Sequence, residues 1–442
     1  MPRPPDVTTS AAELLAPRLE QRIVPGLDRV QRALAAYGNP HERFASVLVV
    51  GTNGKGATAA MLASLLHAHG VRVGLYTSPH LVGVEERIAV GGQPIRPADL
   101  SRLVAELDRF PELSYFETLT VAALWYFAST GAEVAVLEAG LGGRWDAVNA
   151  VHPVVSLLTN VGTDHRAWLG PTRTHIAAEK AAALRGREAI IGTWDGEVEA
   201  TIRQVATAGR LSCATDWVDV EEVEGQRGGQ KRPGNASRLV GAPPSGAPPF
   251  PAPVVRARAD GIDAIATLPL VGRHQLDNLR LAVAGAAALG RCGVAPPLEH
   301  RALVRGVESV RWPGRLQWVE HGGRHLLLDG AHNREAVLAL AAALDETNLA
   351  GRVDLLFSCL RDKPLAEMAA ILAPRADRVT VVTLDSPRAA PTGELAAAFP
   401  GASVATGVAT ALAACRLSSA TLVTGSLYLV GEVLRLTGGM DG

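Results

Sequence analysis

The chain has 442 residues, of which 48% are hydrophobic and 20% charged, so it is neither disordered nor fibrous and has room for two or three domains. Lysine and arginine (43) nearly balance aspartate and glutamate (44), which predicts no nucleic-acid partner and no binding to an acidic membrane. The four widely spaced cysteines fit neither a zinc site nor a disulfide framework, and no uninterrupted apolar run reaches membrane-spanning length. We therefore expect a cytoplasmic protein.

Short apolar strands alternate with alanine-rich helices along the first two thirds of the chain. This pattern predicts an α/β domain with a mostly parallel sheet. Strands are expected at 46–50, 71–76, 134–137, 154–158, 188–192 and 262–268. Helices are expected at 57–68, 115–127, 174–184 and 275–289.

Two stretches interrupt the alternation. Residues 225–253 contain six glycines and seven prolines, which predicts a flexible surface insertion without core elements. Residues 306–313 are predicted to link a first domain, 1–308, to a second, 309–442. In the second domain, strands are expected at 326–328, 353–357, 378–383, 403–405 and 421–423, and helices at 335–345, 365–372, 393–399, 408–416 and 428–436.

The strongest local signal is a glycine-rich turn, GTNGKG at 51–56, between a predicted strand and a predicted helix. In this context backbone N–H groups and the helix dipole hold phosphate oxygens, and Lys55 can reach the outer phosphates. The turn departs from the usual eight-residue pattern, because Val49 stands in place of the first glycine and Gly56 in place of the metal-binding hydroxyl. An ordinary strand-to-helix turn is the alternative interpretation.

Other potential metal ligands follow three predicted strands. Ser78 comes after strand 71–76, Glu138 ends strand 134–137, and His165 closes the loop after strand 154–158. Because the carboxyl ends of parallel strands share one edge of a sheet, these groups could share Mg²⁺ beside a triphosphate. Considered one at a time, each of these residues is more simply explained as an ordinary loop or core residue than as a metal ligand.

Lys180 lies inside a predicted helix, next to Glu179. From the residues alone we expect an exposed lysine paired with a glutamate. In the second domain, Asp329 and His332 lie where a strand ends and a helix begins, a position suited to a nucleotide or substrate. Arg315, just after the predicted linker, could reach a phosphate. A structural turn and a surface arginine are the alternatives for these residues.

Together these motifs resemble the folylpolyglutamate synthase/dihydrofolate synthase family of the Mur ligase superfamily. They occur in family order and span nearly the whole chain. The matching segments are GTNGKG at 51–56, TSPHL at 77–81, ERI at 86–88, FE at 116–117, GLGGRWDAVN at 140–149, TNVGTDH at 159–165, EK at 179–180, GRHQ at 272–275, WPGR at 312–315, DGAHN at 329–333 and TGSLYLVG at 424–431.

The resemblance implies a P-loop ATPase domain followed by a smaller Rossmann-like glutamate-ligase domain. It also implies an ATP-dependent ligase that adds L-glutamate to a folate or to dihydropteroate through an acyl phosphate, with Mg²⁺ as metal. A single bacterial-looking chain favours an enzyme with both activities, and we expect a monomer.

Family similarity also implies roles for individual residues. The expected catalytic residues are Lys55, His165, Lys180 and His332, with Lys180 carried as a carbamate. The expected ATP contacts are Asn53, Gly54, Lys55, Gly56, Thr58, Asn278, Arg315 and Asp329. The expected metal ligands are Ser78, Glu138 and His165. The expected substrate contacts are Gly26, Leu27, Phe116, Arg144, Asp146 and Ser426.

Some residues depart from the family pattern, and two other functions compete. Ala57 replaces the serine that usually follows GTNGKG, so Thr58 would take its phosphate contact, and Trp145 varies the GGRLDATN pattern. A cell-wall Mur ligase would carry a whole domain before the phosphate loop, whereas 50 residues precede Gly51 here. A non-catalytic nucleotide-binding switch would explain the phosphate loop but not the DGAHN and WPGR motifs.

Overall fold

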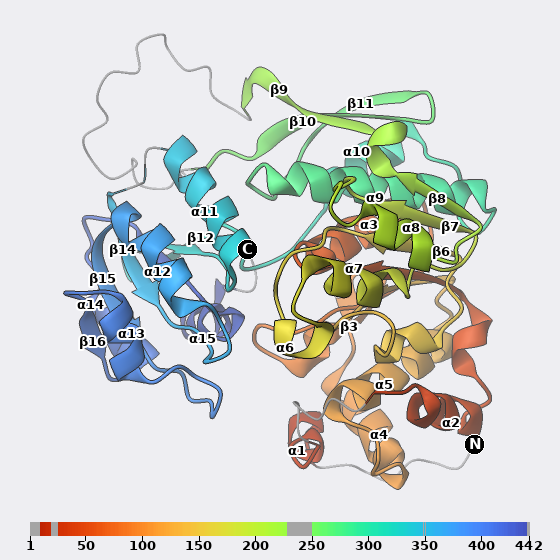
Figure 1. Cartoon of the computed structure of the whole chain (residues 1–442), viewed down its shortest axis with the longest axis horizontal. Coiled ribbons are helices and arrows are strands. Elements are labelled where there is room, and N and C mark those ends of the chain that lie inside the picture. Colours follow the sequence, from red (N-terminus) through yellow and green to blue (C-terminus); the bar gives the residue numbers. More distant parts are fainter. Residues whose placement is uncertain (1–8, 19–24, 228–249, 348, 350, 440–442) are drawn as a thin grey trace. The chain divides into compact units, whose positions relative to one another are not determined.

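The computed structural model describes residues 9–18, 25–227, 250–347, 349 and 351–439. It divides into two compact units. The first comprises Met1–Glu222, Val255–Ala266 and Leu276–Val310, and the second comprises Val223–Val254, Thr267–Gln275 and Arg311–Gly442. Both contain mostly parallel sheets flanked by helices, which confirms the predicted α/β class (Figure 1).

In the part of the first unit that is described, eight strands form one sheet in the order β4-β3-β2-β5-β1-β6-β7-β8. Neighbouring strands from β2 to β8 are parallel, whereas β3 pairs antiparallel with both β2 and β4. The strands are β1 (Ala45–Val50), β2 (Val73–Tyr76), β3 (Ile88–Val90), β4 (Gln93–Pro94), β5 (Val134–Glu138), β6 (Val155–Leu158), β7 (Glu188–Ile191) and β8 (Arg210–Cys213).

Helices cover both faces of this sheet, which explains why its central strands are continuous apolar runs. Leu48 and Val50 of β1 belong to a core that includes Leu119 and Leu124 of α5, while Val47 and Val49 are buried on the opposite face. The α-helices are α1 (Ala11–Leu15), α2 (Asp28–Ala36), α3 (Lys55–Ala68), α4 (Pro97–Glu106), α5 (Tyr115–Ser129), α6 (Arg166–Leu169), α7 (Arg173–Ala181), α8 (Glu199–Val205), α9 (His274–Arg291) and α10 (His300–Glu308). The 3-10 helices are η1 (Pro40–Arg43), η2 (Val84–Arg87), η3 (Leu107–Arg109), η4 (Ala147–Ala150) and η5 (Ala214–Asp216).

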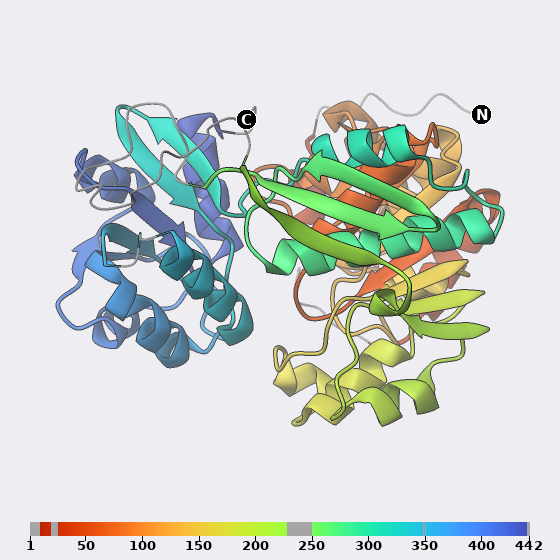
Figure 2. The ribbon, with the colours of Figure 1, turned by 90° about the horizontal axis from the view of Figure 1, so that it is seen from above.

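A separate three-stranded sheet, in the order β11-β10-β9, flanks α9 (Figure 2). Its strands are β9 (Asp219–Arg227), β10 (Pro253–Ala259) and β11 (Ile262–Thr267). The predicted start of the insertion, residue 225, is therefore wrong, because β9 continues through residue 227. The rest of that prediction falls mainly on residues 228–249, which lie outside the described residues.

The predicted linker at 306–313 also begins too early. Helix α10 continues to Glu308 because it buries Leu303, Gly306 and Val307 along one face. The glycine at 306 is needed for packing, since a Cβ there would lie 2.8 Å from the Cα of Leu65 on α3.

In the described part of the second unit, six strands form a sheet in the order β12-β13-β17-β14-β15-β16. Only β12 runs antiparallel to its neighbour. The strands are β12 (Gln317–His321), β13 (Arg324–Leu328), β14 (Val353–Phe357), β15 (Ala376–Val382), β16 (Ser403–Ala405) and β17 (Thr421–Thr424). The helices are α11 (Arg334–Glu346), α12 (Leu365–Leu372), η6 (Ala373–Arg375), α13 (Thr392–Ala398), α14 (Val408–Ala414) and α15 (Leu427–Thr437).

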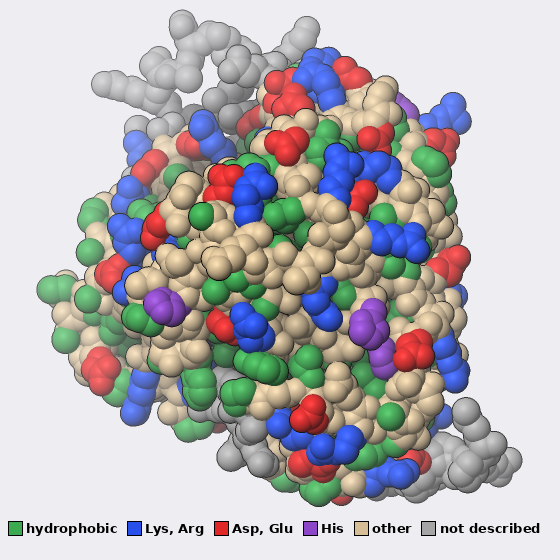
Figure 3. Space-filling model, turned by 45° about the vertical axis from the view of Figure 1, so that its right-hand side comes forward, with side chains coloured by type: hydrophobic (Ala, Val, Ile, Leu, Met, Phe, Trp, Pro, Cys, Tyr) green, Lys and Arg blue, Asp and Glu red, His purple; other side chains and the backbone are tan. Residues whose placement is uncertain are grey.

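The distribution of charge on the surface and the character of the helices both bear on function. Basic and acidic side chains are interspersed on the face shown in Figure 3, in keeping with the near-zero net charge of the sequence. Among the described residues, none of the helices combines the length and the apolar character that crossing a membrane requires.

Candidate active site

The phosphate loop joins the carboxyl end of β1 to the first turn of α3. Gly51 and Gly54 have φ values of +150° and +81°, and a Cβ on either would lie 1.8 Å from Thr159 Oγ1 or 2.3 Å from Asn278 Oδ1, respectively. Glycine is therefore required at both positions by conformation and by space. The first N–H groups of α3, a helix of 14 residues, point out of its amino end and can bind an anion there.

The loop after β6 fixes the shape of the phosphate loop. Thr159 Oγ1 and Asn160 Nδ2 donate hydrogen bonds to the carbonyl oxygen of Asn53 at 2.7 and 3.1 Å, and the backbone N–H of Asn53 donates to Asn160 Oδ1 at 3.0 Å. Lys55 is partly buried and donates from Nζ to the carbonyl oxygen of Thr52 at 3.2 Å. The lysine is thus folded back over the loop, where its charge lies close to the position of a bound phosphate.

Thr58 and Asn278 meet behind the loop. Thr58 is fully buried in α3, and its hydroxyl lies 3.4 Å from Oδ1 of Asn278 on α9. The same amide oxygen is the atom that a Cβ on Gly54 would strike. Asn278 therefore holds the loop from behind, and Gly56, also predicted to contact phosphate, is buried in the first turn of α3.

The three predicted metal ligands all follow strands of the first sheet on one edge. Because β2, β5, β1 and β6 are neighbours and parallel, their carboxyl ends lie side by side. Glu138 is 4% exposed at the end of β5, and its Oε2 accepts a hydrogen bond of 2.9 Å from the backbone N–H of Ser78. His165 has a left-handed backbone (φ +60°) at the start of α6, and its Nε2 lies 3.7 Å from Oδ2 of Asp164.

These residues suit a magnesium ion held jointly with phosphate oxygens. The described residues contain no cluster of three or more His, Cys, Asp or Glu side chains arranged to hold a metal by themselves. Mg²⁺ at nucleotide sites is usually bound by one or two carboxylates, with phosphate oxygens and water as the other ligands. A buried carboxylate at Glu138, next to a serine and close to a phosphate loop, fits that chemistry.

Lys180 is buried, contrary to the expectation from the residues alone. It is 4% exposed, and its Nζ donates a 2.7 Å hydrogen bond to the carbonyl oxygen of Gly51 in the phosphate loop. Its expected partner, Glu179, pairs with Arg144 instead, at 3.0 Å. Burial lowers the pKa of Lys180 to about 7, and the positive charge of Lys55 acts in the same direction.

Asp146 is a second buried ionisable group near Lys55. Its two carboxylate oxygens accept hydrogen bonds from the backbone N–H groups of Leu141 (2.8 Å) and Val148 (3.1 Å), which closes the 140–149 loop. Burial raises the pKa of Asp146 to about 6, against the opposing effect of these hydrogen bonds and of Lys55. In the same loop, the backbone N–H of Arg144 donates to the carbonyl oxygen of Glu179 at 3.0 Å, so Arg144 lies beside α7.

The remaining predicted substrate residues of the first unit lie around the amino ends of α2 and α5, two helices that contact each other. Gly26 and Leu27 lead into α2, while Phe116 is in the first turn of α5, with its ring against Gly140. Arg29 joins the two helices: it donates to Glu117 at 2.7 Å and to the carbonyl oxygen of Gly26 at 3.4 Å.

Sequence reasoning did not identify Arg29, Asp164 or Asn160 as part of this region. Asn160 and Asp164 lie within the matched TNVGTDH segment, so that motif was a usable signal. Arg29 is 88 residues from its partner Glu117 and belongs to none of the recognised motifs, so nothing local indicated it.

In the second unit, three motifs converge at the carboxyl ends of β13 and β17. Asp329 is 6% exposed, and its oxygens accept hydrogen bonds from the backbone N–H groups of Leu316 (3.0 Å) and Ala331 (2.9 Å). Burial raises the pKa of Asp329, and the charges of Arg315 and His274 oppose that shift. A Cβ on Gly330 would lie 2.6 Å from Nη1 of Arg315, so the guanidinium lies directly against the DGAHN turn.

His332 and Ser426 occupy the two turns that follow these strands. Nδ1 of His332 lies 2.8 Å from the carbonyl oxygen of Gly330, and Ser426 is buried at the start of α15, where its hydroxyl accepts from the backbone N–H of Tyr428 at 3.1 Å. The backbone N–H of Gly425 donates to the carbonyl oxygen of Ala331 at 3.0 Å and joins the two turns. The structure thus brings Arg315, Asp329, His332 and Ser426 to one edge of the second sheet.

Comparison with protein families defines the class to which this fold and site belong. Residues 49–287 match the family described as the Mur ligase middle domain, and residues 314–427 match the family described as the Mur ligase, glutamate ligase domain. The chain is therefore a Mur ligase in its domain composition.

Comparison with individual proteins narrows the class. A dihydrofolate synthase/folylpolyglutamate synthase of Bacillus subtilis is 30% identical over 385 residues, covering 84% of each chain. The solved structure of Escherichia coli FolC in complex with DHPP and ADP has a TM-score of 0.82 and 29% identity, covering 99% of this chain and 100% of that one. The chain belongs to the folylpolyglutamate synthase/dihydrofolate synthase family.

Two further matches are a protein about twice as long as this chain and a solved structure with other molecules bound. A Haloferax volcanii protein named "probable bifunctional folylpolyglutamate synthase/dihydropteroate synthase" is 35% identical over 432 residues, but this chain spans only 48% of it. A Yersinia pestis bifunctional folylpolyglutamate synthase/dihydrofolate synthase complexed with AMPPNP and Mn has a TM-score of 0.79 and 28% identity, covering 98% of this chain and 99% of that one.

Proposed function

We propose that the protein is an ATP-dependent ligase that joins L-glutamate to folates, and that it also makes dihydrofolate from dihydropteroate. The observation that carries the proposal is the convergence on one sheet edge of the phosphate loop, the buried Glu138 and the buried Lys180. A nucleotide-binding switch has no need for a buried lysine bonded to its phosphate loop. The relatives that share this fold with bound ADP, AMPPNP or DHPP support the same activity.

The proposed reaction has two steps. An oxygen of the pteroyl or folyl carboxylate attacks the γ-phosphorus of ATP, the bond to the bridging oxygen breaks, and ADP leaves as an acyl phosphate forms. The amine of glutamate then attacks the acyl carbon and loses a proton, and phosphate leaves with the carboxylate oxygen. Phosphorylation is needed because a carboxylate is a poor electrophile at neutral pH.

The chain's own groups stabilise the charge that moves in the first step. Lys55 and the free N–H groups of α3 are fixed in position before the reaction, so they stabilise the transferring phosphoryl group without reorganising. Ser78, Glu138 and His165 would hold Mg²⁺, which when bound neutralises phosphate charge. Asn53, Gly54, Gly56 and Thr58 would shape the phosphate site that Asn278 supports.

Lys180 is proposed to carry a carbamate. An amine whose pKa is lowered to about 7 has a substantial neutral fraction near neutral pH, and only the neutral form attacks CO2. The new N–C bond leaves a carboxylate on the nitrogen, and one proton passes to solvent. Such a group would place an anion beside the phosphate loop, where a metal ion bound to the triphosphate needs oxygen ligands. Arginine cannot react in this way.

Substrate contacts are assigned to both units. In the second unit, Arg315 and Asp329 are proposed to contact ATP, His332 to act near the phosphates, and Ser426 to bind glutamate. In the first unit, the proposed pteroyl contacts are Gly26, Leu27, Phe116, Arg144 and Asp146. The proposal places the ATPase domain at 1–308 and the glutamate-ligase domain at 309–442, in a cytoplasmic monomer.

The test is ADP release under multiple turnover by the full chain with MgATP. We expect sustained release only when L-glutamate and a pteroyl acid are both present. Labelled glutamate incorporated into dihydropteroate and into tetrahydrofolate measures the two activities separately. Release without either acceptor, or acceptance of a UDP-sugar peptide in place of the pteroyl acid, would contradict the proposal. Lys55→Ala serves as the inactive control, since it removes the charge at the transferring phosphoryl group.

A further inference from the structure

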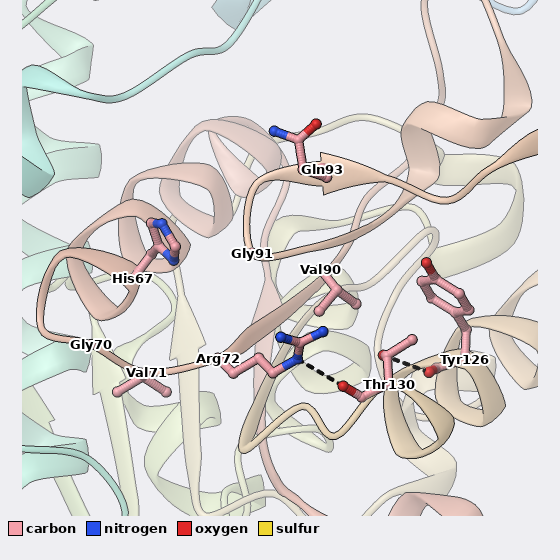
Figure 4. A pocket seen from close by; sticks show the side chains of 9 residues that line it. All are labelled: His67, Gly70, Val71, Arg72, Val90, Gly91, Gln93, Tyr126 and Thr130. Carbon is pink, nitrogen blue, oxygen red and sulfur yellow. Dashed lines mark hydrogen bonds between the residues drawn. The ribbon is translucent and has the colours of Figure 1, made fainter.

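An open cavity of about 510 Å³ lies in the first unit, at the opposite end of the sheet from the phosphate loop (Figure 4). Its walls come from the last turn of α3, the start of β2, the turn between β3 and β4, and the last turn of α5. The lining includes His67, Arg72, Val90, Gln93, Tyr126 and Thr130. Helix α3 begins at Lys55 and reaches the cavity at His67, so roughly 18 Å of helix separates the cavity from the phosphate loop.

Arg72 is an exposed arginine on the wall of this cavity. Its Nε donates a 2.7 Å hydrogen bond to the carbonyl oxygen of Thr130, which fixes the side chain, and Figure 4 shows the guanidinium directed between Val90 and Thr130. Within the described part of the chain, the two Nη groups form neither a hydrogen bond nor an ion pair. The only carboxylate bonded to Arg72 is that of Glu133, which accepts from its backbone N–H at 2.7 Å. The guanidinium therefore offers two parallel donors to a ligand, the geometry that a carboxylate matches.

The other walls are aromatic, apolar or neutral. Tyr126 and His67 present rings, Val90 is 9% exposed, and Gln93 presents an amide. Among the described residues none donates to or accepts from the Tyr126 hydroxyl, the His67 ring or the Gln93 amide. The lining residues include no aspartate or glutamate, and the nearby carboxylate of Glu133 is bonded to the backbone N–H of Arg72. The volume is in the range of cavities that bind small molecules.

We propose that this cavity is a second ligand site, which binds a small aromatic carboxylate. The carboxylate pairs with the Nη groups of Arg72, and the ring packs against Tyr126 and Val90. Arginine favours planar oxyanions with two oxygens in one plane, and the apolar and aromatic walls favour a ring over a free inorganic anion. The inference does not depend on the proposed ligase activity, because the cavity shares no residue with the candidate active site.

The experiment is calorimetric titration of the full chain with 4-hydroxybenzoate. We expect saturable binding at one site per chain, weakened at least about tenfold in Arg72→Gln, because a charge-assisted pair is lost. Arg72→Lys, which keeps the charge but loses the planar fork, should also bind more weakly. Arg378→Gln removes an exposed arginine of the second unit and should bind like the wild type. Thermal unfolding of each variant checks that it is folded, and Tyr126→Leu gives a second, uncharged change that should weaken binding.

Three results would overturn the proposal. The first is no saturable binding of the probe, and the second is equal binding by the wild type and a folded Arg72→Gln. The third is displacement of the probe by inorganic phosphate as effective as displacement by benzoate, which would show a general anion site. If binding were lost in Arg144→Gln and kept in Arg72→Gln, the probe would bind on the pteroyl side of the active site. That outcome is a form of the second result and would also overturn the proposal.

Discussion

Lys180 on α7 donates a 2.7 Å hydrogen bond to the carbonyl oxygen of Gly51 in a buried environment, which ties α7 to the phosphate loop. Burial and the charge of Lys55 both disfavour the protonated form of Lys180. Ionisable groups perturbed in this way are concentrated at functional sites. The contact brings together the phosphate loop, the sheet edge with Ser78, Glu138 and His165, and the 140–149 loop. The 140–149 loop is included because Glu179, the residue before Lys180, pairs with Arg144.

Lys180→Arg should reduce ligation at least about 100-fold, because it keeps the positive charge but cannot form the carbamate. Turnover of the wild type should fall in CO2-depleted buffer and recover when bicarbonate is added. Steady-state ADP release measures both effects, and mass spectrometry of the intact chain under mild conditions looks for the added CO2. Near-normal turnover in a folded Lys180→Arg variant would refute the carbamate.

Gly54→Ala should weaken nucleotide binding more than its backbone strain alone explains. Its Cβ would strike Asn278 Oδ1 at 2.3 Å and displace the side chain that holds the loop. Gly261→Ala is the matched control, because Gly261 has the same φ of +81° and no atom within 4 Å of the added Cβ. Both variants should lose about 1–2 kcal/mol of unfolding free energy from the left-handed backbone. Calorimetric titration with ADP should show a large loss of affinity in Gly54→Ala alone; equal affinities would contradict this interpretation.

Asp146 should make the folded state less stable as pH rises from about 4 to about 6. Its pKa is raised from 3.8 to about 6, so in that window the folded state binds the proton more tightly than the unfolded state, and the free energy of unfolding falls with pH. Asp146→Asn should remove this part of the pH dependence, although it starts from a lower stability because an amide has one acceptor oxygen. Urea unfolding at several pH values measures the slope.

The exposed Asp385 provides the control for that slope. Asp385→Asn makes the same change at an exposed position, so a loss of slope seen in both variants would not come from Asp146. An unchanged slope in Asp146→Asn would show that Asp146 titrates at its ordinary pKa in the folded protein.

Arg29→Met should raise the KM for the pteroyl substrate several-fold and leave the KM for ATP within about twofold, because the Arg29–Glu117 pair joins α2 to α5 beside the proposed pteroyl contacts Gly26 and Phe116. Leaving Glu117 unpaired should also cost about 2–4 kcal/mol of unfolding free energy. The double variant Arg29→Met/Glu117→Gln should recover part of that loss. If both KM values rose equally, the pair would be a general structural contact rather than a positioning one.

Much of the fold was predictable where apolar runs and helical periodicity are regular. The strands β14 and β16 and the helix α12 have the predicted bounds, and β13, β15 and β17 differ by one or two residues at an end. Strand β12 was not predicted. The hairpin β3–β4 was missed because β4 is two exposed residues without an alternating pattern. Strand β9 was missed because its sequence, DVEEVEGQR, is mostly polar.

The site shows the same division between local and distant information. The phosphate loop and the strand-end positions of Ser78, Glu138 and His165 follow from local pattern and parallel topology. The burial of Lys180 was readable in principle, because it lies four residues after Ile176 and shares its buried face of α7. The Arg29–Glu117 pair depends on how two distant helices pack, and no local pattern encodes that contact.

The most direct test of the acyl-phosphate mechanism follows the carboxylate oxygen. A pteroyl acid labelled with ¹⁸O in its reacting carboxylate is converted by the full chain with MgATP and L-glutamate, and the released phosphate is analysed by mass spectrometry. The account predicts one ¹⁸O atom in phosphate for each amide formed. Phosphate without label, at normal amide yield, would contradict it.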